Sequence, residues 1–287
     1  MSGPPQVAVV TDSTAYLPAE VVERYGLTVV PLQVVLDGRV GTEGEQVTPA
    51  DIAAALNHRR AKVSTSRPPP ATFLAAYDDA AKLAGVTDIV SVHLSGELSG
   101  TVESARLAAA EAAPRLRVRV VDSRSTAMGL GFAVIAAAEA AADGNPLDGV
   151  QAAARRQADA TSSLFYVATL EHLHRGGRLG AAATLLGSAL SVKPILHVVD
   201  GRIAPLVKVR TASKALARLE ELAVEAAGED VVELAVHHLA APQRATELAD
   251  RLRYRVTGAR QVYVSEVGAV VGAHVGPGLL GVVVARR

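Results

Sequence analysis

The chain has 287 residues, of which 49% are hydrophobic and only 3% aromatic, and its 29 Lys and Arg residues balance 29 Asp and Glu residues. This length is sufficient for two ordinary domains, each with an aliphatic core. The absence of cysteine excludes disulfides, thiolate catalysis and cysteine-ligated zinc, and the scattered, balanced charges disfavour nucleic acid as a partner, because phosphate binding normally needs a basic excess.

The first half of the chain alternates short β-branched runs with helical segments. Strands are expected at 7–10, 27–36, 88–94 and 117–121. Helices are expected between them, among them 18–25, which Gly26 closes with a left-handed cap, and 49–60, which Thr48 caps at its start. Strands that alternate with helices at this spacing predict βαβ units around a parallel sheet. We therefore expect an N-terminal parallel, Rossmann-like α/β domain over residues 1–162.

The second half has a different rhythm. Strands are expected at 164–169, 193–199, 202–209, 231–237, 261–267 and 279–284, and helices at 180–190, 213–227 and 242–256. Asp200-Gly201 is a strong hairpin signal, so the second and third of these strands should form an antiparallel pair. This pattern predicts a C-terminal mixed α/β domain over residues 163–287.

Small hydroxyl residues form several turns of the predicted first domain. The turns are 12–14, 65–66, 95–101 and 122–126. Ligands of open parallel sheets bind beyond the carboxyl ends of the strands, and a helix start at that place adds unpaired N–H groups. The turns therefore indicate a site for carboxylate or phosphate oxygens, although each turn by itself also suits an ordinary helix cap. Segment 95–101, with two glycines and three hydroxyls, exceeds what a cap needs.

Signatures of other chemistry are absent or incomplete. No G-x-G-x-x-G follows the first strand, no Gly-Lys-Ser/Thr occurs, and residues 96–100 read Gly-Glu-Leu-Ser-Gly where a nucleophile elbow needs G-x-S-x-G. His172-x-His174 and His237-His238 have no acidic partner nearby in the sequence, so we expect no metal and no other cofactor. His274 stands apart from them, because it precedes the turn Gly276-Pro277-Gly278.

Taken together and in order, these turns resemble the DegV family. The resemblance spans essentially the whole chain, and its pieces occur in the family's order and spacing. The matching pieces are 9–14 (VVTDST), 64–68 (STSRP), 94–101 (LSGELSGT), 121–123 (VDS), 173–179 (LHRGGRL), 192–196 (VKPIL), 209–211 (VRT) and 274–278 (HVGPG).

The resemblance implies a fatty-acid carrier. Members of the family are two-domain α/β proteins that enclose a long-chain fatty acid, such as palmitate, stearate or oleate, between the domains, and a separate fatty acid kinase phosphorylates the bound carboxylate. By this resemblance the carboxylate should meet Thr65, Ser95 and His274. Its close neighbours should be Ser66, Gly96 and Ser99, and Asp12 should organise its loop. The family often has two hydroxyls where this chain has Ser95-Gly96, so one donor is missing or is replaced by a backbone N–H.

Further roles are expected for apolar and basic residues. Burying a tail of about fifteen methylenes contributes on the order of 10 kcal/mol, against about 1–3 kcal/mol for each head-group hydrogen bond, so the tail should supply most of the affinity. Candidates for the tail pocket, each of which also suits plain core packing, are Leu185, Leu186, Ile195, Leu196 and Leu279. Candidates for docking the kinase, each of which also suits a solvated surface, are Arg175, Arg178 and Arg210.

Two other functions stay open at this point. A serine esterase would use Ser95 or Ser99 as nucleophile and His274 as base, with an acid such as Asp12 to orient the histidine. A carrier of another anionic lipid would share the site and differ in its cargo. The missing elbow and the surplus of hydroxyls favour a carrier without catalytic activity of its own.

The ends and the apolar runs of the sequence bear on location. The N-terminal residues lack the basic start and apolar stretch of a signal peptide. No apolar run approaches the roughly 20 residues of a membrane span. We therefore expect a cytoplasmic protein with no membrane span and at most transient contact with a membrane surface.

Overall fold

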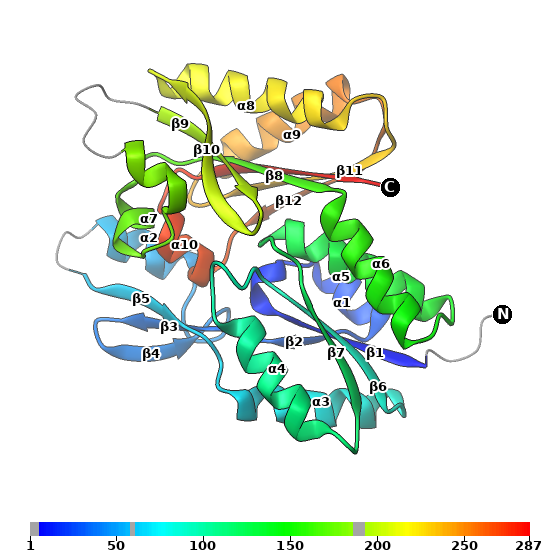
Figure 1. Cartoon of the computed structure of the whole chain (residues 1–287). Coiled ribbons are helices and arrows are strands. Elements are labelled where there is room, and N and C mark those ends of the chain that lie inside the picture. Colours follow the sequence, from blue (N-terminus) through cyan, green and yellow to red (C-terminus); the bar gives the residue numbers. More distant parts are fainter. Residues whose placement is uncertain (1–5, 58–60, 186–192) are drawn as a thin grey trace. The chain divides into compact units, whose positions relative to one another are not determined.

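The computed structural model describes residues 6–57, 61–185 and 193–287 (Figure 1). These residues form two compact units: the first combines the residues up to Leu32 with Ser66–Asp159, and the second combines Gln33–Thr65 with Ala160–Arg287. The predicted domains, 1–162 and 163–287, differ from these units mainly in residues 33–65. That segment clusters with the C-terminal half because its strands and helix pack against helix α10 (Ala269–Val275).

The first unit is built on a parallel sheet of four strands in the order β2-β1-β6-β7, as the sequence predicts. Its strands are β1 (Val7–Asp12), β2 (Thr28–Val30), β6 (Asp88–His93) and β7 (Arg117–Asp122). Each neighbouring pair runs parallel. Every residue of the two central strands, β1 and β6, is buried, which is the usual condition of a parallel sheet with both faces covered.

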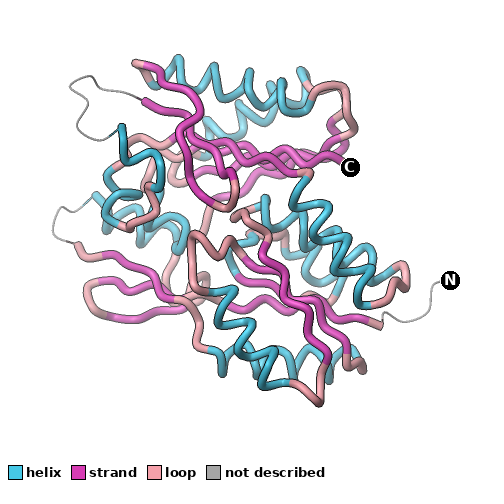
Figure 2. The backbone as a smooth tube through the Cα atoms, in the orientation of Figure 1, coloured by secondary structure: helices cyan, strands magenta, loops and turns pink. Residues whose placement is uncertain are grey.

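Helices lie on both faces of this sheet (Figure 2). They are α1 (Ala19–Tyr25), α3 (Pro70–Ala84), α4 (Thr101–Ala112), α5 (Met128–Ala142) and α6 (Leu147–Asp159), with a 3-10 turn η1 at Ser13–Ala15. The α3 and α4 helices pack against each other on one face, where Phe73 and Tyr77 meet the alanines of α4. On the other face α5 is almost entirely buried, so it is apolar on all sides rather than amphipathic.

The predicted strand 27–36 is split between two sheets. Its first part is β2, and its second part, β3 (Gln33–Leu36), pairs antiparallel with β4 (Arg39–Thr42). Pro31 separates the two parts, because proline has no N–H to donate to a strand ladder. Asp37 and Gly38 turn the hairpin with φ of 50° and 83°. Strand β5 (Val63–Ser66) completes this small sheet in the order β4-β3-β5, and helix α2 (Pro49–Asn57) lies between β4 and β5 in the chain.

The second unit contains a mixed sheet of six strands in the order β10-β9-β8-β13-β11-β12. The strands are β8 (Thr161–Tyr166), β9 (Lys193–Val199), β10 (Arg202–Val209), β11 (Val232–His238), β12 (Ala259–Glu266) and β13 (Leu280–Arg286). Only β11 and β12 run parallel, and the other neighbours are antiparallel. The predicted hairpin at Asp200-Gly201 is confirmed, and the mixed α/β class of this half is confirmed with it.

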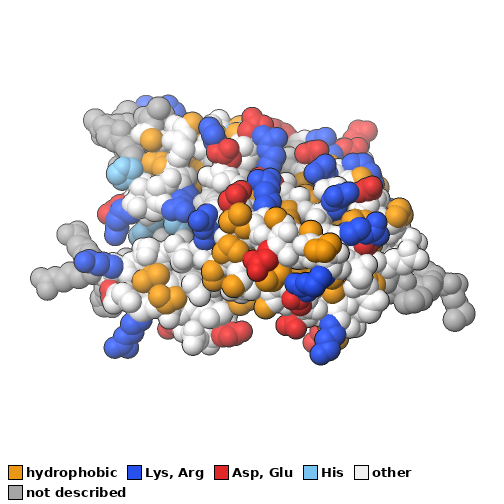
Figure 3. Space-filling view, turned by 60° about the horizontal axis from the view of Figure 1, so that its bottom comes forward, with side chains coloured by type: hydrophobic (Ala, Val, Ile, Leu, Met, Phe, Trp, Pro, Cys, Tyr) orange, Lys and Arg blue, Asp and Glu red, His pale blue; other side chains and the backbone are white. Residues whose placement is uncertain are grey.

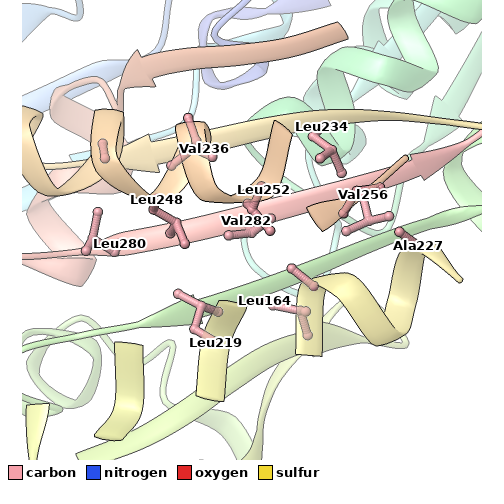
Figure 4. Close-up of a cluster of buried hydrophobic side chains, with 14 of the residues drawn as sticks. Leu164, Leu219, Ala227, Leu234, Val236, Leu248, Leu252, Val256, Leu280 and Val282 are labelled. Carbon is pink, nitrogen blue, oxygen red and sulfur yellow. The ribbon is translucent and has the colours of Figure 1, made fainter. Parts of the chain in front are cut away.

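Helices α8 (Ala212–Ala227) and α9 (Pro242–Arg255) bury the main core of the second unit against this sheet (Figure 4). Leu219 of α8 and Leu248 and Leu252 of α9 are at most 2% exposed, and they meet Leu164 and Val282 of the sheet. On the molecular face that Figure 3 shows, positive and negative side chains are interspersed with apolar ones.

Two short helices and two short strands have no counterpart among the predicted elements. They are α7 (Glu171–Arg175), α10, β4 and β5, each too short to show a period. The predicted helix 180–190 begins as a 3-10 helix, η2 (Gly180–Leu185), and its remainder lies outside the described residues, as do the last residues of the predicted helix 49–60.

The packing of α9 predicts a large effect of truncation at Leu248. Replacing Leu248, which is 2% exposed, by alanine removes apolar contacts and leaves a cavity, so the free energy of unfolding should fall by about 2–5 kcal/mol. Glu247→Ala is the matched control, because Glu247 is its exposed neighbour on the same helix. Urea unfolding followed by circular dichroism measures both, and equal effects of the two substitutions would contradict the assigned core.

Candidate functional site

Asp12 organises the carboxyl ends of β1 and β6 in the first unit. Its buried carboxylate accepts hydrogen bonds from the backbone N–H of Thr14 (3.1 Å) and from the Thr14 hydroxyl (2.5 Å). It also accepts one from the backbone N–H of Leu94 (3.0 Å) and lies 3.0 Å from Nδ1 of His93. Four partners on one buried carboxylate fix the loop after β1 against the end of β6, which is the role expected of Asp12.

The segment 95–101 is held rigidly by its own hydrogen bonds. Ser95 is fully buried, its Oγ accepts from the backbone N–H of Glu97 at 3.2 Å, and its backbone N–H donates to the carbonyl of Ser125 at 2.8 Å. The hydroxyls of Ser99 and Thr101 lie 2.8 Å apart at the start of α4. These contacts match those of a helix-capping turn, and they also place three hydroxyls in one short loop.

The backbone N–H of Gly96 is already engaged in the first unit. It donates to Oδ2 of Asp122 at 3.1 Å, and a Cβ added to Gly96 would lie 2.9 Å from the same oxygen. The glycine is therefore needed because the Asp122 carboxylate lies against it. The N–H that sequence reasoning offered as a substitute donor for a ligand is satisfied within the protein.

Thr65 and His274 meet in the second unit, although 209 positions separate them in the sequence. Oγ1 of Thr65, on β5, lies 2.9 Å from Nε2 of His274, on α10. Both residues are half-buried. The pair combines a hydroxyl and an imidazole, two groups that can each donate one hydrogen bond to an oxygen. Of the three residues predicted to hold the carboxylate, these two are brought together, and the third, Ser95, belongs to the first unit.

Two further contacts hold α10 against segment 33–65. Glu43, which is 6% exposed, accepts a hydrogen bond from the backbone N–H of Val270 at 2.8 Å, in the first turn of α10. A carboxylate at this end of a helix satisfies an otherwise unpaired N–H and favours the helix dipole. Gly272, in the middle of the helix, lies close to Ile52 of α2. The helix is therefore fixed along its length before its last turn presents His274.

Helices α7 and α10 interlock through two glycine–histidine contacts. A Cβ on Gly176, just after α7, would lie 2.1 Å from Nδ1 of His274, and a Cβ on Gly276, just after α10, would lie 2.2 Å from Cδ2 of His172. Gly276 also has φ of +73°, which favours glycine. Each helix thus has a glycine where the other has an imidazole ring, so only glycine fits at either position.

The surroundings of His274 keep its imidazole neutral. Burial lowers the pKa of His274 to about 4, and the positive charge of Arg178 acts in the same direction. Arg178, which is half-buried, donates a hydrogen bond to the carbonyl of Gly176, next to the His274 ring. The surroundings of His274 therefore combine a neutral imidazole with the positive charge of Arg178.

The remaining predicted site residues are distributed as follows. Ser66 is exposed, and its hydroxyl donates to the carbonyl of Arg67 at 3.3 Å. Arg175 is exposed and lies 2.7 Å from Glu171 on its own helix, whereas Arg210 is exposed just after β10. The tail-pocket candidates Ile195, Leu196 and Leu279 are all buried, Leu186 lies outside the described residues, and only the backbone of Leu185 is described.

Sequence reasoning missed Glu43, His172 and Gly176. His172 and His174 lie two positions apart on α7 and so point in different directions, and no sequence signal paired His172 with a glycine a hundred residues away. Among the described residues, no group of three or more His, Asp and Glu side chains could hold a metal ion. Across residues 6–57, 61–185 and 193–287, no helix has the length and apolarity that a membrane crossing requires.

A serine–histidine–aspartate chain is present in the first unit, but it is sealed in the core. Ser91 Oγ lies 2.6 Å from His93 Nε2, and His93 Nδ1 lies 3.0 Å from Asp12. All three residues have an exposure of 0%, and Tyr77 donates to the Ser91 hydroxyl at 3.0 Å. No ester can reach this serine, and Asp12, the acid that the esterase hypothesis assigned to orient His274, is bound to His93 instead.

Comparisons with known proteins agree over the whole chain. Residues 6–287 match the family described as "Uncharacterised protein, DegV family". A DegV domain-containing protein of Streptomyces coelicolor is 57% identical over 281 residues, which cover 98% of this chain and 99% of that protein. A DegV domain-containing protein of Mycobacterium tuberculosis is 40% identical over 278 residues, covering 97% and 96%.

Two solved structures share the fold. A DegV family protein from Thermus thermophilus, described for its fatty acid binding, is 33% identical with a TM-score of 0.91, covering 98% of this chain and 100% of that one. DegV from Bacillus subtilis, described as a fatty acid binding protein, is 32% identical with a TM-score of 0.89, covering 99% and 100%. The two-domain α/β class expected from the sequence is confirmed.

The buried histidines of the second unit predict an acid-sensitive fold. Burial lowers the pKa of His274 and of His237 to about 4, from an ordinary value of 6.5, so the unfolded chain takes up these protons first as the pH falls. The free energy of unfolding should therefore be greatest above pH ~6.5 and decrease towards pH ~4, by roughly 2 kcal/mol per histidine between pH 7 and pH 5. Urea unfolding at both pH values measures the change. His274→Gln should lose less stability than the native protein, and an unchanged loss would argue against a buried neutral His274.

Proposed function

The chain belongs to the DegV family, and from this membership together with the contact between Thr65 and His274 we propose that it binds a long-chain fatty acid by its carboxylate. The relatives from Thermus thermophilus and Bacillus subtilis, described as fatty acid binding, support the choice of ligand. The observation that carries the proposal is the 2.9 Å contact between Oγ1 of Thr65 and Nε2 of His274, because it joins two predicted carboxylate ligands across 209 positions of sequence.

The head group is held by uncharged donors and one nearby cation. Thr65 supplies a hydrogen bond through its hydroxyl, which lies 2.9 Å from Nε2 of His274. Arg178 supplies positive charge near His274, and the family resemblance adds Ser95 from the first unit. Each such bond contributes about 1–3 kcal/mol to a charged oxygen. A tail of about fifteen methylenes contributes on the order of 10 kcal/mol before ordering costs. The tail therefore dominates the affinity, and the donors decide which end of the ligand lies at Thr65.

The protein acts as a carrier in this proposal, and catalysis belongs to a separate kinase that phosphorylates the bound carboxylate. Arg175 and Arg210 are exposed and are the proposed docking residues. Arg178 is better suited to the head group, since it lies near His274 and is half-buried. Leu279, which follows the Gly276–Gly278 turn, is the tail-pocket candidate nearest in sequence to the head-group site. The esterase alternative is disfavoured by the bonds that occupy Asp12.

Lipid extraction is the direct test of cargo. Protein purified from two unrelated hosts should release one long-chain fatty acid per chain into organic solvent, identified by mass spectrometry. Delipidated protein should bind the same acid again, and its methyl ester, which lacks the charge, should bind more weakly. Recovery of no acyl chain from either host, with no rebinding, would refute the proposal.

Substitution at Thr65 tests the head-group contact. Thr65→Val keeps the shape of the side chain but removes the hydroxyl, so the Kd for a fluorescent long-chain fatty acid should rise about 10–100-fold. Thr65→Ser keeps the hydroxyl and is the matched control, with an expected change of less than about 3-fold. Unchanged affinity of the valine variant, with an unchanged circular dichroism spectrum, would remove Thr65 from the binding site.

A further inference from the structure

The two ring nitrogens of His274 have unequal surroundings. Nε2 lies 2.9 Å from Oγ1 of Thr65. Nδ1 is buried and has no hydrogen-bond partner among the residues that the structure describes. Gly176 covers this second nitrogen: a Cβ on Gly176 would lie 2.1 Å from Nδ1 and 2.8 Å from Cε1. The Cα–H bond that such a Cβ would replace therefore points at Nδ1.

The contact between the Cα–H of Gly176 and Nδ1 of His274 favours a lone pair on Nδ1 over a proton. A Cα–H group is a weak donor and cannot accept, so it is compatible with a lone pair on Nδ1 and offers nothing to an N–H. A buried N–H without a partner is also rarer and more costly than an acceptor that is used incompletely. Because the imidazole is neutral, only one of its nitrogens carries a proton, and the surroundings assign that proton to Nε2.

We propose that Gly176 is a positioning residue that selects the Nε2–H tautomer of His274, so that Thr65 presents its O–H to the ligand. In this tautomer Nε2–H donates to Oγ1 of Thr65, and the hydroxyl proton of Thr65 is free for a second acceptor. In the other tautomer the Thr65 proton would be used on Nε2, and the lone pairs left on Oγ1 would repel a carboxylate.

The tautomer gives the site a chemical preference, which rests on the proposed function. The series of hydrogen bonds that begins at the N–H of His274 ends with the O–H of Thr65 as a donor. Hydrogen bonds in such a series polarise one another. A ligand must therefore offer an acceptor at that point. A fatty carboxylate fits this requirement, whereas a primary ammonium of the same chain length offers only donors and is excluded.

The position of Gly176 is fixed by the reciprocal contact on the neighbouring helix. The His172 ring lies against Gly276 as the His274 ring lies against Gly176, so α7 cannot shift along α10 without a clash at one contact. Leu173, the residue after His172, is fully buried and holds α7 in place. Gly176 has φ of −75°, which any residue adopts, so the backbone conformation does not require glycine. The closest atoms to an added Cβ belong to the His274 ring, at 2.1 and 2.8 Å, and the carbonyl oxygen of His172 follows at 3.2 Å.

Nitrogen NMR of the ligand-free protein tests the tautomer directly. Long-range ¹H–¹⁵N correlation spectra at neutral pH distinguish a protonated ring nitrogen from one with a lone pair, and His274→Gln assigns the signal by its loss. We expect Nε2 of His274 in the protonated range and Nδ1 in the lone-pair range. The reverse pattern, or an average of the two, would overturn the proposal.

Gly176→Ala tests the cause. The added methyl must displace the His274 ring, so the single-tautomer pattern should be lost and the Kd for a long-chain fatty acid should rise at least 10-fold. Gly281→Ala is the matched control, because its Cβ would meet no atom closer than 3.5 Å and should leave both measurements unchanged. A Gly176→Ala protein that folds and keeps the native pattern would overturn the role of Gly176. If this variant does not fold, the spectrum of the native protein decides.

The same samples separate this inference from the proposed function. Adding a long-chain fatty acid should shift the His274 signals, and adding the amine of the same length should not. If the acid causes no shift while the Nε2–H pattern is present, the proposed function fails and the tautomer stands. Binding of the amine as tightly as the acid would contradict the preference for acceptors.

Discussion

The contact between Thr65 and His274 depends on a small set of constraints that act at a distance from it. Neither residue is placed by its own neighbours in sequence, since Thr65 lies on an edge of a three-stranded sheet and His274 lies in the last turn of a short helix. Glu43 binds the start of that helix and Gly176 abuts the ring at its end. These contacts hold Nε2 of His274 against the hydroxyl of Thr65, so the pair keeps one geometry.

Burying the imidazole of His274 costs free energy of folding, and the apolar core of the second unit offsets this cost. A buried imidazole with one unpaired nitrogen loses the hydrogen bonds that water would give it. The core formed by α8, α9 and the six-stranded sheet supplies apolar burial in the same unit, so a local loss near His274 is tolerated. In the first unit, by contrast, buried polar side chains are hydrogen-bonded to one another: His93 contacts Ser91 through one ring nitrogen and Asp12 through the other. The first unit thus pairs its buried polar groups with one another, whereas Nδ1 of His274 in the second unit is buried without a hydrogen-bond partner among the described residues.

The architecture was largely predictable, and the reasons are local. Strands with β-branched runs, the Gly26 cap and the Asp200-Gly201 turn all carry their signals within a few residues. The sequence places residues 33–65 in the N-terminal domain, because adjacency is the only guide it offers, whereas their packing partner α10 is more than two hundred positions away. For the site, hydroxyl turns and a family resemblance pointed to Thr65 and His274. The glycine–histidine contacts were not predictable from the sequence. Gly176 and Gly276 are explained only by the imidazole rings that lie against them, and those rings are located only by the structure.

Residues 33–65 belong to the second unit, but in the sequence they lie between the two parts of the first unit. This order has a consequence for synthesis on the ribosome. The ribosome adds about 5–20 residues per second, and 209 positions separate Thr65 from His274. Segment 33–65 therefore emerges roughly 10–40 s before the helix that completes its packing. During this interval β3, β4 and β5 can pair with one another, but α2 and β3 lack α10, the helix against which they pack. The contact between Thr65 and His274 forms late in this order, because it joins residues that lie 209 positions apart in the sequence.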